Sequence, residues 1–166
     1  MTSIETERLL LRKPTEADVD DPPAFLADPR VVDFLGGVDD DLCGVVRRWL
    51  EEWDTYPAGK LIVETAASER IGRVGVNFYD PVRWVRSSSP DAQPELTWAL
   101  AHEHWGKGYA TEAAAAFRDW YGPGLISLIE PRNIRSQRVA ERLGARPGET
   151  IELPQFGPHV VWRHPG

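Results

Sequence analysis

The chain has almost no cysteine and no long apolar run. Cys43 is the only cysteine among 166 residues, which excludes an internal disulfide and a thiolate metal cluster. It lies in an apolar helical stripe, so we expect a buried, unreactive thiol. No apolar run reaches 18 residues, and the first residues lack the apolar segment of a signal peptide. These absences favour a cytoplasmic protein that does not enter a membrane.

Basic residues are outnumbered as well. The chain carries 19 Lys and Arg against 26 Asp and Glu, a formal net charge of -7. Extended contact with nucleic acid needs a dense basic face, so we expect no nucleic-acid partner. Histidine and cysteine show no paired ligand spacing, and we expect no metal. The acid excess tilts the choice of substrate towards a cation such as an amine.

What is present indicates one globular domain over residues 1–166. A chain of this length buries roughly two-thirds of its unfolded surface. A hydrophobic content of 42% and a charged content of 27% are ordinary for such a domain. The 14 prolines, 14 glycines and seven tryptophans predict many turns and rigid aromatic anchors.

Hydrophobic periodicity predicts the order of strands and helices. Strands are expected at 5–12, 60–64, 70–79, 95–101, 125–129, 150–153 and 159–163, and helices at 42–53, 110–121 and 133–143, with short helical pieces over 15–36. The second and third strands form a hairpin. The late alternation of strand and helix favours adjacent parallel strands in a mixed sheet with helices on both faces, and ligands gather where such strands end. The long loop at 80–94 is either a tolerated insertion or a substrate lid.

The stretch 103–112 joins the strand at 95–101 to an Ala-rich helix through Gly106 and Gly108. Glycines permit a positive φ and a close approach of the backbone, and a helix start adds unpaired N–H groups and partial positive charge. The turn is therefore predicted to bind phosphate or pyrophosphate. It is not a P-loop, because no Ser or Thr follows Gly-Lys, and Thr111 stands where a dinucleotide fingerprint needs its third glycine.

Four passages resemble the GCN5-related N-acetyltransferase (GNAT) superfamily, and within it the ribosomal-protein-alanine N-acetyltransferase type. They are Thr6 to Arg12, Ile71-Gly72, Glu95 to Glu112, and Asn133 to Ala145. The resemblance covers nearly the whole chain. It implies the GNAT fold: an α/β (α+β) domain with a mixed, mostly antiparallel central sheet, one parallel pair splayed into a V, and helices on both faces. The parallel pair would be 95–101 and 125–129.

By this resemblance the turn binds the pyrophosphate of acetyl-coenzyme A, and the pantetheine arm lies in the V. The expected cofactor-binding residues are Leu100, Ala101, His104, Trp105, Gly106, Lys107, Gly108, Tyr109, Ala110, Asn133 and Ser136. Backbone groups of Leu100 and Ala101 would pair with the pantetheine amides. Glu103 departs from the family pattern of Gln or Arg, so we expect its side chain to face solvent. Lys107 is either a charge at the rim or a surface lysine.

The expected catalytic residues are Glu95 and Ser136. Glu95 occupies the position where many relatives have a Glu that takes the proton from the amine directly or through water, although a structural role is the alternative. Ala140 stands where many relatives have a Tyr that protonates the leaving thiolate. Ser136 is then expected to hydrogen-bond the sulfur or relay a proton, or else it caps a helix with Asn133. His104 contacts phosphate or is an exposed histidine.

The resemblance implies acetyl transfer from acetyl-coenzyme A to a primary amine by direct attack in a ternary complex. The acceptor is either a protein N-terminal amine or a small molecule such as an aminoglycoside or polyamine. Phe78, Tyr79 and Glu95 are expected to contact it, together with the 80–94 loop. The alternative from another class is a coenzyme A-binding protein of the same fold without catalysis. The aromatic-rich surface would permit a homodimer.

Overall fold

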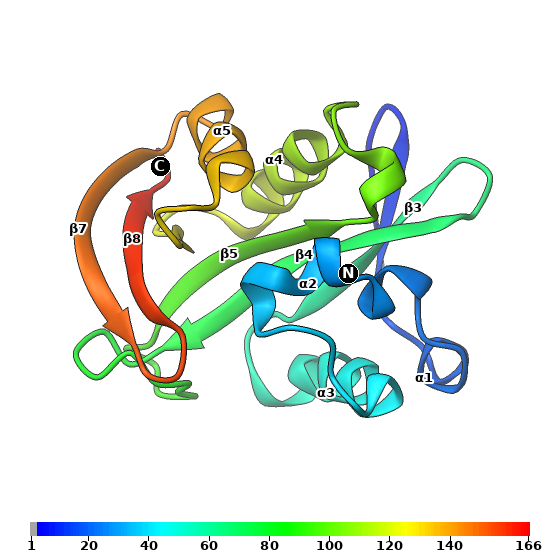
Figure 1. The fold of residues 1–166 in the computed structure, drawn as a ribbon, viewed down its shortest axis with the longest axis horizontal. Helices are drawn as coiled ribbons and strands as arrows, with labels where there is room; N and C mark the ends of the chain where they lie inside the picture. Colours follow the sequence, from blue (N-terminus) through cyan, green and yellow to red (C-terminus); the bar gives the residue numbers. More distant parts are fainter. Residues whose placement is uncertain (1–2) are drawn as a thin grey trace.

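The computed structural model describes residues 3–166, which are organised around one eight-stranded sheet (Figure 1). The strand order is β1-β2-β3-β4-β5-β6-β8-β7. The strands are β1 (Ser3–Glu5), β2 (Leu9–Arg12), β3 (Lys60–Thr65), β4 (Arg70–Tyr79), β5 (Gln93–Leu100), β6 (Ile126–Ile129), β7 (Arg146–Leu153) and β8 (Gly157–Arg163). All neighbours are antiparallel except β5 and β6. The expected mixed, mostly antiparallel sheet with one parallel pair is confirmed.

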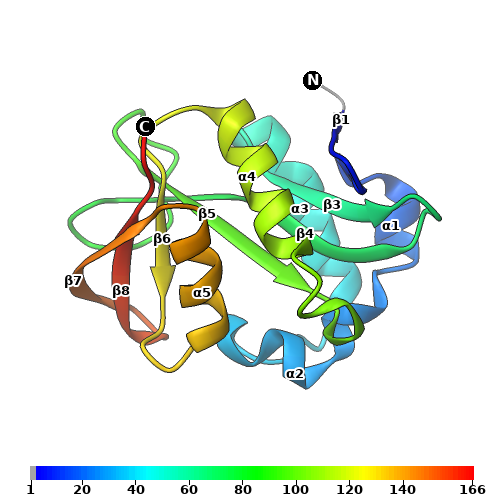
Figure 2. The same cartoon turned by 90° about the horizontal axis from the view of Figure 1, so that it is seen from above.

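Helices cover both faces of the sheet. They are α1 (Glu16–Asp20), α2 (Pro29–Val32), α3 (Leu42–Thr55), α4 (Tyr109–Tyr121) and α5 (Ile134–Arg142). Figures 1 and 2 show α4 and α5 on one face and α3 on the other. The largest part of the core lies between the sheet and α4, where Phe117 is fully buried. Over the described residues, no helix is both long and apolar enough to cross a membrane.

The helix α3 shows how the sequence places its buried face. Asp41 caps it by accepting a hydrogen bond from Gly44 N at 2.9 Å, and Val46 and Trp49 are buried against the sheet side. Cys43 is exposed, so the expected buried thiol is wrong. At about 100° per residue, Cys43 lies roughly 60° around the helix from Val46 and 120° from Trp49, which places it at the edge of the buried stripe, in the first turn of the helix.

The first expected strand is divided in two. Residues 5–12 were predicted as one strand, whereas β1 and β2 form a hairpin around a turn at 6–8. Thr6 closes this turn, because its Oγ1 accepts from Leu9 N at 2.9 Å and its N donates to Leu9 O at 2.9 Å. A Thr side chain that bonds to a nearby backbone amide competes with strand pairing.

The parallel pair separates immediately after it forms. The register joins β5 and β6 only at Glu95 and Ile126. One residue further, the Ser127 hydroxyl donates to Leu96 O at 2.7 Å, so a side chain bridges the strands where the backbone ladder stops. From there β5 continues along β4 while β6 pairs with β8. The result is the V-shaped opening expected between these strands.

His164 secures the base of this V and should make stability depend on pH. Because Ser127 Oγ donates to Leu96 O, it accepts from His164 Nε2 at 2.8 Å, and the imidazole is neutral with Nε2 protonated. Burial, and then Arg118, lowers the pKa of His164 from 6.5 to about 4. The unfolded chain therefore binds a proton more readily, and stability present above pH 6.5 is lost as the pH falls towards 4.

We expect this loss to reach about 3 kcal/mol. Urea unfolding of the wild type and of His164→Gln, compared between about pH 7 and about pH 4.5, measures it. The glutamine retains an amide for Ser127 but does not titrate, so the wild type should lose more stability on acidification than the variant. Equal pH slopes for the two proteins would contradict the prediction.

Candidate active site

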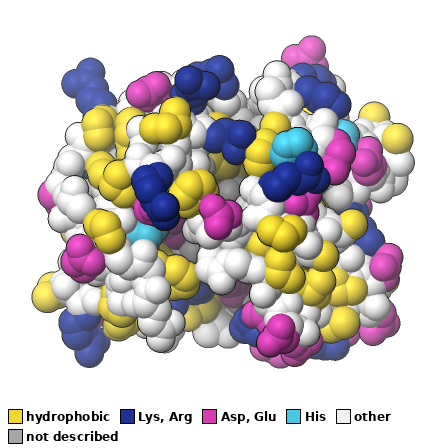
Figure 3. Space-filling view, viewed as in Figure 1, with side chains coloured by type: hydrophobic (Ala, Val, Ile, Leu, Met, Phe, Trp, Pro, Cys, Tyr) yellow, Lys and Arg dark blue, Asp and Glu magenta, His cyan; other side chains and the backbone are white. Residues whose placement is uncertain are grey.

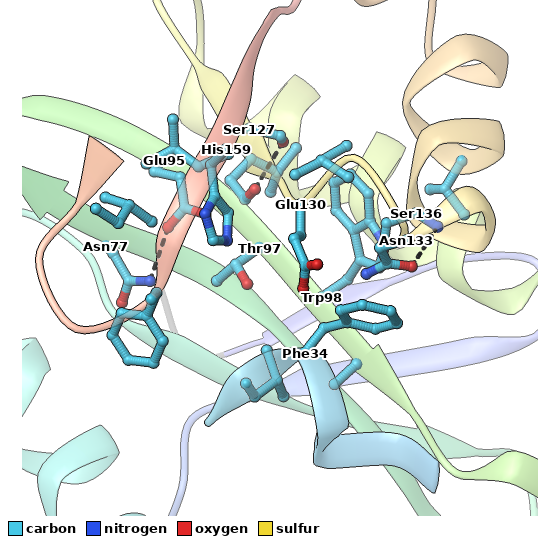
Figure 4. A pocket seen from close by; sticks show the side chains of 18 of the residues that line it. Phe34, Asn77, Glu95, Thr97, Trp98, Ser127, Glu130, Asn133, Ser136 and His159 are labelled. Atoms are coloured by element: carbon cyan, nitrogen blue, oxygen red, sulfur yellow. Dashed lines mark hydrogen bonds between the residues drawn. The ribbon is translucent and has the colours of Figure 1, made fainter. Parts of the chain in front are cut away.

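A cavity of 550 Å³ occupies the opening between β5 and β6. Its lining includes six consecutive residues of β5, from Glu95 to Leu100. Side chains of a strand alternate between the two faces of a sheet, so one cavity can touch six in a row only by passing the strand edge. Figure 4 shows Asn77, Glu95 and His159 at one side, and Trp98, Asn133 and Ser136 at the other. The cavity therefore connects the two faces of the sheet.

Glu95 is a buried carboxyl group at one end of the cavity. Its side chain accepts a hydrogen bond from Asn77 Nδ2 at 2.8 Å on Oε2, and the residue is 7% exposed. Burial raises the pKa of Glu95 above its ordinary value, against the opposing effects of Asn77, Lys60 and Arg73. A carboxylate with a raised pKa accepts a proton more readily near neutral pH. Proton uptake is the role that the sequence analysis expected for Glu95.

Lys60 and Asn77 orient Glu95 through a chain of hydrogen bonds. The Lys60 ammonium lies 3.0 Å from Glu52 Oε2 and 2.6 Å from Asn77 Oδ1. Because an ammonium only donates, the oxygen of Asn77 must face Lys60 and its NH₂ must face Glu95. Burial lowers the pKa of Lys60 to about 8. Neither residue was anticipated, since a Lys at a strand start and an Asn within a strand carry no motif.

The glycine turn at the other end is open to an anion. Gly106 and Gly108 have φ of 77° and 80°, and a Cβ at Gly106 would meet no atom within 4 Å. Gly108 is the N-cap of α4 and supplies no side-chain cap, so the first-turn N–H groups are available. Together with the helix dipole, these features fit a diphosphate.

The polar side chains around the turn contact one another. Glu103 is exposed, as expected from its departure from the family pattern, and approaches Arg30 at 3.9 Å. His104 Nε2 lies 3.1 Å from Glu69 Oε1, and Lys107 Nζ lies 3.4 Å from His104 Nδ1. Lys107 is exposed at the rim of the turn. Both histidine nitrogens thus have protein partners.

The strand edge beside the turn is only partly free. The Ala101 amide N–H donates to Ile71 O at 2.6 Å within the sheet, so it is already paired. The alternation of an antiparallel ladder then directs the backbone groups of Leu100 and Trp98 away from β4 and into the opening. Leu100 O also accepts from Trp105 Nε1 at 2.9 Å. Trp105, Ala110 and the first turn of α5 complete this part of the lining.

Asn133 and Ser136 stand together at the start of α5. Asn133 Oδ1 accepts from Ser136 N at 3.1 Å, which is the helix cap that the sequence predicts. Both residues also line the cavity. The capping bond uses the backbone of Ser136 and leaves its hydroxyl group for another partner.

The expected acceptor residues are divided between the cavity and the core. Tyr79 lines the cavity, and burial raises its pKa well above the ordinary value. Phe78 does not: it is 5% exposed and stacks on Tyr56 with ring centroids 5.4 Å apart. Adjacent strand residues point to opposite faces, so the expectation for Phe78 is corrected. From the loop after β4, Trp84, Val85 and Arg86 reach the cavity.

The opening Thr-Glu-Arg passage also acquires a physical role. The Glu112 carboxylate of α4 accepts from Thr6 Oγ1 at 2.6 Å and from Arg8 N at 2.9 Å. Arg8 also donates to Lys107 O at 2.9 Å. These contacts fasten the glycine turn and the start of α4 to the N-terminal hairpin. Sequence reasoning missed them because the partners are about 100 residues apart.

Metal-binding groups are not assembled here. Within residues 3–166, no three His, Cys, Asp or Glu side chains come together as a set that could hold a metal ion.

Comparison with known proteins gives a consistent result. A family model described as the acetyltransferase (GNAT) domain matches residues 8–146. The crystal structure of an acetyltransferase from Agrobacterium tumefaciens is 33% identical with a TM-score of 0.78, over 99% of this chain and 95% of that chain. The aminoglycoside acetyltransferase AAC(6')-Ib, solved with ribostamycin and coenzyme A, is 22% identical and has a similar fold, with a TM-score of 0.76 over 95% and 94% of the two chains.

Curated proteins are similar over different lengths. The N-acetyltransferase p20 of Bacillus licheniformis is 27% identical over 156 residues, which cover 86% of this chain and 82% of that protein. The protein YkkB of Bacillus subtilis is 41% identical over 63 residues, and this match spans only 34% of the chain and 36% of YkkB. The chain belongs to the GNAT acetyltransferase family and is an N-acetyltransferase.

Proposed function

We propose that the protein acetylates a primary amine with acetyl-coenzyme A as donor, by direct attack within one complex of both substrates. The continuous cavity carries this proposal, because it joins the uncapped start of α4 to the buried carboxyl group of Glu95 through the opening between β5 and β6. The aminoglycoside acetyltransferase of similar fold was solved with coenzyme A. It supports the choice of donor.

The residues near the glycine turn fit acetyl-coenzyme A. Backbone N–H groups of residues 106 to 110 would hold its pyrophosphate, because those of His104 and Trp105 already donate to Ala101 O and His102 O. The backbone of Leu100 would pair with its pantetheine arm. The Ala101 amide is already committed to Ile71, so it contributes less than the sequence implied. Acetyl-coenzyme A supplies the acetyl thioester when bound. Trp105 and Ala110 would position it along the cavity wall, and Gly106 and Gly108 form the turn beyond.

Glu95 receives the proton of the amine. Its Oε2 accepts from Asn77, and the carboxyl group also accepts a backbone hydrogen bond from Leu128. We assign the proton to Oε1, which takes it directly or through a water molecule. Burial raises the pKa of Glu95 against the effects of Asn77, Lys60 and Arg73, and this makes the carboxylate a stronger base. An α-amine with a pKa near ~8 needs only such modest help.

Ser136 is placed to assist at the sulfur end. Its backbone N–H donates to Asn133 Oδ1, and the residue lines the cavity. Ala140 is fully buried and has no proton to give. We assign to the Ser136 hydroxyl a hydrogen bond to the sulfur of the leaving thiolate. The α5 N-terminus adds partial positive charge there.

Several features of the function are carried from the sequence as predictions. These are one acetyltransferase domain over residues 1–166, the ribosomal-protein-alanine type, a protein N-terminal amine as one acceptor class, a cytoplasmic location and a homodimer. A coenzyme A-binding protein without catalysis is the competing function.

Titration calorimetry with acetyl-coenzyme A, followed by thiol release in the presence of a panel of amines, tests the proposal. Binding without turnover of any amine would favour the competitor.

A further inference from the structure

Arg73 is a buried cation that no part of the proposed reaction uses. It lies on β4 and is 7% exposed. Its side chain lines the active-site cavity and also a second cavity of 440 Å³ on the α3 side of the sheet. A buried guanidinium costs several kcal/mol unless its charge and its N–H groups are matched. Its partners therefore have to be accounted for.

The protein leaves most donors of Arg73 unmatched. Within residues 3–166 its one side-chain hydrogen bond runs from Nη1 to Thr97 Oγ1, at 3.3 Å, whereas a guanidinium has five N–H donors. The carboxylates nearby are engaged elsewhere. Glu95 accepts from Asn77, and Glu52 pairs with Lys60 and Arg86 at 3.0 and 3.3 Å. Arg73 thus presents free donors to the cavity.

The charges around Arg73 leave room for one negative charge. The buried cations Lys60 and Arg73 balance the buried carboxylates Glu52 and Glu95. The exposed Arg86, which also lines the cavity, adds one positive charge in excess. A carboxylate carries the single negative charge that balances this group, and its two oxygens match the fork of a guanidinium. A doubly charged phosphate would exceed the balance.

We propose that the acceptor is a primary amine that also bears a carboxylate, which Arg73 binds while Glu95 receives the amine. This inference rests on the proposed function. Arg73 bonds to Thr97, and Glu95 is two residues away along β5, a spacing of roughly 7 Å. The two groups are thus close enough to hold the amine and the carboxylate of one small molecule, as in an amino acid. A polyamine or aminoglycoside would instead bring a second ammonium against Arg73.

Matched substrate pairs test the inference. Thiol release from acetyl-coenzyme A is measured with free amino acids against their carboxamides, and with peptides that begin with Asp or Glu against those that begin with Asn or Gln. A preference in the first set would identify the acceptor as a free amino acid, and a preference in the second set would identify it as a peptide with an acidic first residue. We expect kcat/KM to be at least about 100-fold higher for the carboxylate member of the responding pairs, as for other desolvated charge pairs.

Variants of Arg73 locate this preference. In Arg73→Gln we expect the preference, the ratio of kcat/KM between the carboxylate and carboxamide members of a pair, to fall by about 100-fold, and Arg73→Lys should lose less. Arg73 also favours the charged form of Glu95, so its loss slows both members of a pair and the ratio isolates the carboxylate. Arg83→Gln is the matched control, because Arg83 follows β4 in the adjacent loop, is 73% exposed and does not line the cavity. If Arg73→Gln does not fold, the substrate pairs on the wild type decide alone.

The outcomes separate this inference from the proposed function. Equal kcat/KM within the pairs, or acetylation confined to uncharged or polycationic amines such as spermidine, would overturn the carboxylate and leave the acetyltransferase in place. Turnover of no carboxylate-bearing amine would also overturn it. Absence of acetyl-coenzyme A binding in titration calorimetry would count against the proposed function itself.

Discussion

Replacement of Glu95 by Gln is expected to lower kcat by about 10²–10⁴-fold, the usual contribution of a general base, while acetyl-coenzyme A binds as in the wild type. Glutamine has the shape of the carboxyl group and can still accept from Asn77 through its oxygen. It cannot take a proton. Single-turnover acetylation and titration calorimetry with acetyl-coenzyme A measure the two effects separately.

Glu130→Gln is the control for this experiment. Glu130 also lines the cavity, where it is paired with Arg132 at the end of β6, and the proposed reaction assigns it no proton. Its replacement should leave kcat within a small factor of the wild type. A comparable loss in both variants would mean that the charge of the cavity, rather than proton transfer to Glu95, sets the rate.

The pH dependence gives a second measure of Glu95. Burial raises the pKa of Glu95, and a protonated carboxyl group cannot act as base, so wild-type turnover should fall as the pH drops through this raised pKa. Glu95→Gln should lack that limb. The ratio of the two rates should narrow as the pH rises towards the pKa of the amine, because a neutral amine needs no base. If Glu95→Gln turned over as fast as the wild type at every pH, Glu95 would not be the base.

The sequence predicted the parts of the site that local chemistry determines. The strand predicted at 95–101, the turn with Gly106 and Gly108, and the cap made by Asn133 each follow from residues a few positions apart. Periodicity and capping act over such distances. The splayed parallel pair was implied by family resemblance, whereas the hydrogen bond from the Ser127 side chain to Leu96 O, which bridges the strands where the backbone ladder stops, was not foreseen.

Contacts across the sheet could not be predicted in the same way. Lys60, Asn77 and Glu95 form one chain of hydrogen bonds only because β3, β4 and β5 lie side by side in this register. A shift of one residue would move Asn77 to the other face. Phe78 was expected at the acceptor site together with Tyr79, but only one of two neighbouring strand residues faces the cavity, and the register determines which one.

Net charge also proved a poor guide to the site. A charge of -7 favours a cationic substrate at long range, yet the groups around the acceptor end carry one surplus positive charge, which the exposed Arg86 supplies. Figure 3 shows acidic, basic and hydrophobic side chains mixed over the face that carries α2 and α5. The local cluster, which lies close to the reacting groups, outweighs a distant and screened surface charge.

Replacement of Gly108 by Val is expected to weaken acetyl-coenzyme A binding by about 10- to 100-fold or more, since several of its hydrogen bonds depend on this turn. Gly108 has φ of 80°, a region that β-branched residues avoid, and it is the N-cap of α4. Valine forces the turn out of this conformation and turns the amide groups of the following residues away from the pyrophosphate. Titration calorimetry with acetyl-coenzyme A measures the change.

Gly122 offers a matched control at the other end of the same helix. It has φ of 103° and ψ of -167°, a region that is essentially restricted to Gly, and a Cβ there would meet no atom within 4 Å. Gly122→Val therefore also imposes backbone strain, but far from the turn. Both variants should lose folding stability, by about 1–3 kcal/mol for a strained backbone conformation, but only Gly108→Val should lose acetyl-coenzyme A affinity. Both variants strain the backbone, but only Gly108 lies in the turn. Unchanged acetyl-coenzyme A affinity in folded Gly108→Val would therefore show that the diphosphate binds elsewhere.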